Sequence, residues 1–100
     1  MKDIKNYIQE NKERFLEELS GLLRIPSISS EAAHKPDMQK AAEYWKGQLL
    51  QAGADKAEVM PTSGNPVVYG EKIVDPGAKT VLVYGHYDVM PVDPVELWKT

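Results

Sequence analysis

The sequence predicts an α/β layered fold, and three observations support this prediction. Apolar residues recur with helical spacing over residues 3–23 and again over residues 38–52. Beyond Gly53 the periodicity changes to that of extended chain, interrupted by clusters of Pro, Gly, Ser and Asn. Residues 81–84, Val-Leu-Val-Tyr, are apolar on both faces, which is typical of a central strand covered by helices on two sides. We therefore expect two long helices followed by about three strands.

The first helix is expected from residue 3 to residue 23, where apolar side chains recur at spacings of three, four and seven. Asp3 is the predicted N-cap, because its carboxylate can accept a hydrogen bond from a free amide of the first turn. The helix should end before Ile25 and Pro26, since a residue before proline is pushed out of the α region and proline has no amide proton. Residues 27–30, Ser-Ile-Ser-Ser, are then expected to form a loop.

The second helix is expected to begin near Pro36 and Asp37, with the proline in its first turn and the acid near the positive end of the helix dipole. Gly53 should end it, because a left-handed residue at this position favours glycine. Trp45 lies on the apolar stripe of this helix, so we expect it to pack in the core.

Three strands are expected after the second helix, at residues 57–60, 67–73 and 80–84. Residues 61–66 separate the first two with a cluster of strand breakers. Residues 75–77, Asp-Pro-Gly, suit a tight turn with proline first and glycine where φ is positive. The second and third strands are therefore expected to pair as an antiparallel hairpin.

The composition excludes several classes of protein. With 42% hydrophobic and 27% charged residues the chain is typical of an ordinary soluble globular segment. A net charge of −3 without a basic cluster excludes nucleic acid as a partner. No apolar run approaches the ~20 residues that span a bilayer, and residues 1–6 lack the apolar core of a signal peptide, so we expect no membrane contact and a cytoplasmic location. Without cysteine, any metal must be bound by His, Asp or Glu.

His86 and Asp88 are the candidate site residues. They follow the most apolar predicted strand, and active sites of open α/β sheets lie outside the carboxyl ends of strands. In extended chain residues i and i+2 share a face. His86 can therefore bind a metal through one ring nitrogen while Asp88 accepts a hydrogen bond from the other. One histidine does not make a metal site, because catalytic zinc needs about three protein ligands.

A longer pattern around these residues resembles a known family. Residues 84–92, Tyr-Gly-His-Tyr-Asp-Val-Met-Pro-Val, followed by Leu97 and Trp98, resemble the first metal-binding motif of the co-catalytic zinc peptidases. This family comprises aminoacylases, bacterial carboxypeptidases and carnosinase-like dipeptidases. Residues 23–29, Leu-Arg-Ile-Pro-Ser-Ile-Ser, are similar to its loop after the first helix. The order of elements also matches, so the resemblance covers essentially the whole chain, and it is greatest for the dipeptidase branch.

The resemblance implies that residues 1–100 are the N-terminal part of a three-layer α/β/α catalytic domain, without the family's lid or dimerisation domain. His86 would ligate one of two zinc ions, and Asp88 would be the catalytic residue that orients its imidazole. The bridging aspartate, the Glu-Glu pair with the general base and the other ligands would lie further along. The implied full-length protein is a homodimeric zinc dipeptidase that hydrolyses a dipeptide or short peptide with a metal-activated water.

For residues 1–100 alone we expect no peptidase activity and little or no bound zinc, because most of the ligand set is missing. We also expect self-association through apolar faces that the full-length protein covers. Two alternatives stay open: a stand-alone non-catalytic α/β interaction module, and a catalytically inactive relative that keeps the fold. A reading frame that continues with Asp, Glu-Glu and His segments would favour the enzyme over the module.

Other polar and aromatic residues have simpler interpretations. His34 lies in a polar loop and is expected to be solvated. Asp93 and Glu96 are expected to be solvated or to cap a turn, because no histidine accompanies them. Trp98 is interpreted as a residue that packs beneath the active-site rim of the full-length protein and is exposed in this chain. Ser27 and Ser29 lack the Gly-x-Ser-x-Gly frame of a nucleophile elbow.

Overall fold

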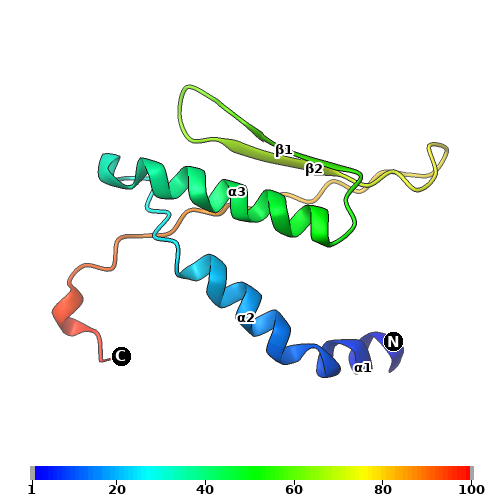
Figure 1. Ribbon diagram of the computed structural model, residues 1–100, viewed down its shortest axis with the longest axis horizontal. Coiled ribbons are helices and arrows are strands. Elements are labelled where there is room, and N and C mark those ends of the chain that lie inside the picture. The colour runs from blue at the N-terminus through cyan, green and yellow to red at the C-terminus, as the bar shows by residue number, and fades with distance from the viewer. Residues whose placement is uncertain (1, 100) are drawn as a thin grey trace.

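The computed structural model describes residues 2–99. Met1 and Thr100, at the ends of the predicted portion of the catalytic domain, lie outside the described residues. Within residues 2–99 the chain forms three α-helices, a two-stranded sheet and two short 3-10 helices. The predicted α/β class is confirmed, with two strands in place of about three. Figure 1 shows helix α3 between the β-hairpin and helix α2.

The first predicted helix is two helices, α1 (Lys2–Glu10) and α2 (Lys12–Leu23). Asn11 interrupts them with φ −106° and ψ 9°, and its side-chain amide donates to the carbonyl oxygen of Tyr7 at 2.9 Å. Asparagine competes in this way for backbone groups, which weakens it as a residue of the helix interior. The prediction that Asp3 is the N-cap is wrong, because α1 already includes Lys2 and Asp3 lies in its first turn. The predicted end at Leu23 is confirmed.

Helix α3 (Lys35–Gln51) follows a short 3-10 turn, η1 (Ala32–His34), and has its proline in the first turn as predicted. Its predicted end is also confirmed. Gly53 has φ +103°, its amide donates to the Leu50 carbonyl oxygen at 3.1 Å, and the Ala54 amide donates to that of Leu49 at 3.0 Å. These two bonds satisfy carbonyls that the last turn leaves free and form a Schellman motif.

Strands β1 (Lys56–Met60) and β2 (Val67–Glu71) pair antiparallel, with Lys56 opposite Glu71 and Met60 opposite Val67. Helix α3 packs on this hairpin. The approach is close at Gly70, where an added Cβ would lie 2.9 Å from Cδ1 of Leu49. The small core is buried between these elements and the loop after α2, and it consists of Ile28, Met38, Ala41, Ala42 and Ala57.

Helix α2 rests on α3 through one close contact. The Tyr44 hydroxyl donates to the Glu18 carbonyl oxygen at 2.6 Å, and Gly21 leaves room for it, since an added Cβ would lie 2.6 Å from that hydroxyl. This contact joins α2 to α3 shortly before the loop of residues 24–31 begins. Among residues 2–99 no helix is both long enough and apolar enough to cross a membrane.

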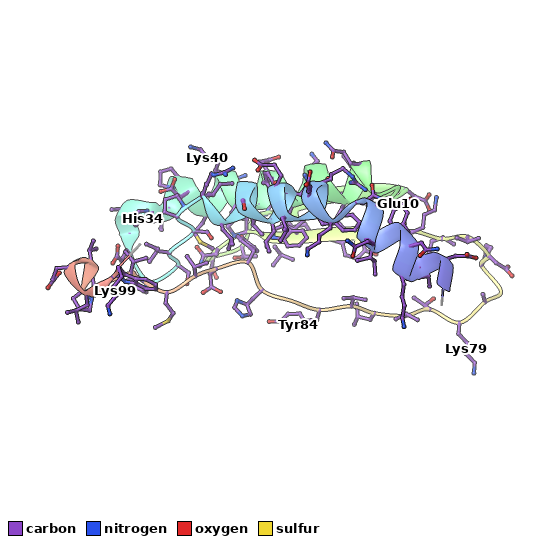
Figure 2. The ribbon with its side chains drawn as sticks, turned by 90° about the horizontal axis from the view of Figure 1, so that it is seen from below. Glu10, His34, Lys40, Lys79, Tyr84 and Lys99 are labelled. Carbon is purple, nitrogen blue, oxygen red and sulfur yellow. The ribbon has the colours of Figure 1, made fainter. Side chains whose placement is uncertain are left out.

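The prediction of a third strand at residues 80–84 is wrong. Residues 80–84 form no strand and do not pair with β2, whose described partner is β1. Val81, Leu82, Val83 and Tyr84 are 84–90% exposed. In Figure 2 the segment that bears Tyr84 runs as a separate trace below the helices. The apolar pattern specifies a segment that needs cover on both faces, but a strand also requires a neighbouring strand, and none of the described residues supplies one.

Candidate metal site

The candidate site forms where residues 86–89 cross the loop after α2. Ile28 and Val89 make an isolated parallel β-bridge, and the Val89 amide donates to the Ser27 carbonyl oxygen at 2.9 Å. The Ser27 hydroxyl donates to the Tyr87 carbonyl oxygen at 2.9 Å, and Ser27 is only 1% exposed. This loop therefore holds the backbone on both sides of Asp88.

The structure brings His86 and Asp88 together, as their i, i+2 spacing predicts. Nδ1 of His86 lies 2.7 Å from Oδ1 of Asp88, and the Ser29 hydroxyl donates to Oδ2 of the same carboxylate at 2.6 Å. Both carboxylate oxygens thus have a hydrogen-bond partner. The hydrogen bond from Ser29, and after it the one from His86, lowers the pKa of Asp88 below its ordinary value.

The contact with Asp88 also determines the tautomer of the His86 imidazole. An ionised carboxylate can only accept hydrogen bonds, so Nδ1 of His86 must carry the proton, and Nε2 of the neutral ring keeps its lone pair. The His86 side chain is 76% exposed, which leaves Nε2 accessible to a cation. The role of His86 as a metal ligand stays a prediction, but the geometry is that of an imidazole oriented to bind one.

The ligand set is incomplete in this part of the protein. Among residues 2–99 no group of three or more His, Cys, Asp or Glu side chains gathers closely enough to hold a metal ion. A catalytic zinc site uses about three protein ligands. Among the described residues His86 therefore offers a metal a single oriented donor.

Tyr87 bonds to a different part of the chain from its neighbours His86 and Asp88. Its hydroxyl donates to the carbonyl oxygen of Pro66, in the loop of the hairpin. Burial, and to a lesser degree the charge of Asp88, raises the pKa of Tyr87. This contact ties the site to the hairpin, so His86 is followed by two anchored residues, Tyr87 and Asp88.

An open groove of about 540 Å³ lies beside the site, between α3, the hairpin and residues 83–88. Met38, Trp45 and Leu49 line it from α3. The prediction that Trp45 packs in the core is wrong, because its side chain is 38% exposed at this groove. The helical stripe placed Trp45 on the correct face, but the segment opposite does not cover it.

The remaining predicted residues lie apart from the site. His34 is not simply solvated as predicted: its Nδ1 lies 2.8 Å from Oδ2 of Asp37, in the first turn of α3. Asp93 and Glu96 are exposed, in agreement with a solvated role. The indole of Trp98 donates to the Val92 carbonyl oxygen at 2.8 Å and stays largely exposed.

Sequence reasoning did not assign a role to Ser27 or Ser29. Both were predicted only as loop residues after the first helix, and a nucleophile role was excluded because the Gly-x-Ser-x-Gly frame is absent. The available signal was their place in the segment 23–29 that resembles a family motif. That segment and the metal motif meet in space although about 60 residues separate them, as the Ser27 to Tyr87 bond shows.

Comparison with known proteins finds several dipeptidases among the relatives. The chain is 33% identical over 105 residues to Cys-Gly metallodipeptidase DUG1 of Candida albicans, covering 93% of this chain and 22% of that protein. It is 31% identical to a cysteinylglycine-S-conjugate dipeptidase of Corynebacterium striatum, covering 88% of this chain and 19% of that one. No family model matches the chain.

A solved structure of the dipeptidase Dug1p from Saccharomyces cerevisiae is similar to this chain with a TM-score of 0.83 and 31% sequence identity. The match covers 93% of this chain and 22% of that one, in its N-terminal part. The chain therefore spans about a fifth of the length of the relatives it matches.

Proposed function

The chain is a homologue of the N-terminal part of the Cys-Gly metallodipeptidases, and from this premise we propose that it forms the first part of a metallodipeptidase catalytic domain. The observation that carries the proposal is the oriented imidazole of His86, which leaves Nε2 free at the end of an extended segment. The relatives favour an enzyme over the stand-alone interaction module. The proposed reaction is hydrolysis of the peptide bond of a dipeptide or short peptide.

In this proposal His86 is a metal ligand and Asp88 orients it. Asp88 holds the Nδ1 proton, so the ring presents Nε2 in one direction. The proposed metal is zinc, with two ions in the complete site, and a bound ion of this kind supplies the Lewis acidity that hydrolysis without a covalent intermediate requires. The groove beside His86 contributes an apolar wall from α3.

We propose that the activity belongs to the full-length protein and that residues 1–100 alone are inactive. A single donor retains little of the free energy of metal binding, because a site forms only when its ligands gather together. The full-length protein is proposed to be a cytoplasmic homodimer. Residues 1–100 alone are proposed to self-associate, since the segment of residues 81–84 exposes four consecutive apolar side chains.

The test compares the two histidines in the full-length protein. His86→Ala removes the proposed ligand, and His34→Ala is the matched control, because His34 also pairs with an aspartate. Zinc affinity is measured by chelator competition, and hydrolysis is measured with Cys-Gly, the dipeptide in the relatives' names. His86→Ala should weaken zinc by more than about 100-fold, above the loss of ~10–100-fold typical of a ligand's hydrogen-bond partner, and should abolish turnover.

His34→Ala should bind zinc and hydrolyse Cys-Gly like the unsubstituted protein. If His86→Ala keeps its zinc and its turnover, the assignment of His86 is wrong. If the unsubstituted full-length protein binds no metal and cleaves no dipeptide, the proposed function itself is wrong.

A further inference from the structure

We propose that Ser29 is a positioning residue of the metal site: its hydroxyl fixes the Asp88 carboxylate, which in turn fixes the ring of His86. This inference rests on the proposed function, because it concerns how the chain prepares His86 to bind a metal. It adds a residue that lies 59 positions before Asp88 in the sequence and belongs to a different loop.

Ser29 provides a hydrogen bond to the Asp88 side chain from outside the segment that contains His86. The bond is short, 2.6 Å from the Ser29 hydroxyl to Oδ2, and it leaves Oδ1 for Nδ1 of His86 at 2.7 Å. The three side chains thus form a chain in which both oxygens of the Asp88 carboxylate have a defined partner and Nε2 of His86 stays free. A carboxylate with both oxygens occupied has one preferred plane, whereas the terminal torsion of a free aspartate is broad.

The segment before Asp88 cannot supply this order by itself. Val83 and Tyr84 are more than 80% exposed, and an added Cβ on Gly85 would meet no atom within 4 Å. His86 itself is largely exposed. The direction of its ring therefore depends on what holds the residues that follow it.

Those residues are held by the loop of Ser27, Ile28 and Ser29, which contacts both their backbone and the side chain of Asp88. Ser27 and Ile28 hold the backbone, through the bonds to Tyr87 and Val89 and the β-bridge. Ser29 acts on the side chain of Asp88. Ser27 is buried, so its role is structural, whereas Ser29 is half-buried and can lose its hydroxyl without leaving a buried group unpaired. Ser29 is therefore the residue whose removal should disturb the site more than the fold.

The experiment uses the full-length protein with three substitutions. Ser29→Ala removes the hydroxyl, Ser29→Thr keeps it, and Ser30→Ala is the control at an exposed serine of the same loop. Zinc affinity is measured by chelator competition, and the melting temperature of the metal-free protein reports the fold. Ser29→Ala should weaken zinc by about tenfold, the lower end of the range for a ligand's hydrogen-bond partners. Ser29→Thr should restore the affinity, and Ser30→Ala should not change it.

A second readout separates positioning from a merely structural role. In the metal-free protein labelled with ¹⁵N-histidine, the His86 ring should show the Nδ1-protonated tautomer, and Ser29→Ala should convert this signal into a mixture of tautomers. Ser29→Thr should return the single tautomer. If Ser29→Ala does not fold, Ser29→Cys is measured instead, because a thiol is a weaker donor of similar size, and it should give the same mixture with weakened zinc binding.

The proposal is overturned if Ser29→Ala or Ser29→Cys binds zinc and keeps its tautomer like the unsubstituted protein. It is also overturned if Ala and Thr lose affinity equally while the melting temperature falls, since Ser29 would then act on the fold alone. Failure of the proposed function looks different: the unsubstituted full-length protein would then bind no zinc and cleave no dipeptide.

Discussion

The two histidines of the described chain both pair with an aspartate, and the regions around them differ. Nδ1 of His34 lies 2.8 Å from Asp37 at the start of α3, and Nδ1 of His86 lies 2.7 Å from Asp88. Nε2 of His34 faces a second carboxylate, that of Glu31, at 3.6 Å. The His34 side chain is 28% exposed and that of His86 is 76% exposed.

A histidine bonded to an aspartate therefore does not by itself indicate a metal site. His34 has carboxylates near both ring nitrogens, so the pair serves the turn that begins α3. The carboxylate beside His86 orients the ring and leaves the other nitrogen free. The useful criterion is the direction of the free nitrogen, because a metal binds through that lone pair.

The same contrast extends to the regions that carry the two pairs. His34 precedes α3 and the hairpin, where each element packs on the next. His86 follows the exposed residues 81–84, which have apolar side chains and no pairing strand among the described residues. The region around His34, which includes α3 and the hairpin, is packed within the described chain. The apolar residues 81–84 that precede His86 stay exposed.

The largest expected effect comes from truncating one apolar side chain in each region of residues 1–100. Met38 is 3% exposed, so Met38→Ala should destabilise the fold by about 2–5 kcal/mol. Leu82 is 90% exposed, so Leu82→Ala should change the free energy of unfolding by less than about 0.5 kcal/mol. Urea unfolding of dilute protein measures both. Equal losses would contradict the contrast, because they would mean that residues 81–84 are packed in solution.

Local signals predicted the ends of α3, whereas the pairing of β1 with β2 was not predicted, since the second strand was expected to pair with residues 80–84. Pro36 and Gly53 marked the two ends of α3, because both act through the backbone of a single turn. Asn11 interrupts the first helix although the apolar stripe continues through it, so the competition by its side chain was not visible in the periodicity. The pairing of residues 80–84 was mispredicted because a strand is defined by its neighbour, which periodicity cannot identify.

The next effect compares the two aspartates in the full-length protein. Asp88→Asn should weaken zinc binding by about 10–100-fold, because the amide can present its NH₂ group to Nδ1 and change the favoured tautomer. Asp37→Asn makes the same change beside His34 and should leave zinc affinity unaltered. Chelator competition measures both variants. A loss at Asp37 comparable to that at Asp88 would remove the distinction between the two pairs.

The site was predictable to the extent that it is local. His86 and Asp88 lie two residues apart, and the geometry of extended chain alone brings them onto one face. Ser29 could not be assigned in this way, since its contact with Asp88 depends on how the loop after α2 crosses a segment 59 residues later. That crossing is made by contacts of Ser27 and Ile28 with Tyr87 and Val89, which local periodicity cannot identify.

The smallest effect concerns the stability in acid of the region formed by α3 and the hairpin. Asp55 accepts hydrogen bonds from the Ile73 amide at 2.7 Å and from Lys72 at 3.1 Å, and these lower the pKa of Asp55. A carboxyl group whose pKa is lower in the folded state than in the unfolded state stabilises the fold at pH values above its unfolded pKa, about 3.9 for Asp. This contribution is lost as the pH falls through the folded pKa. Asp55→Asn should therefore flatten the acid limb of stability against pH.

Urea midpoints between neutral and acid pH measure this change. The Asp55→Asn protein should lose less stability on acidification than the unsubstituted protein. An acid limb that stays equally steep would show that the contacts of Asp55 do not contribute to the stability of the hairpin end.

The central claim is that His86 faces a metal through Nε2 while Asp88 holds Nδ1. The most direct measurement is a crystal structure of the full-length protein grown with zinc. A zinc ion should lie about 2.0–2.1 Å from Nε2 of His86, with the Asp88 carboxylate still bonded to Nδ1. A His86 ring directed away from every zinc ion in that structure would contradict it.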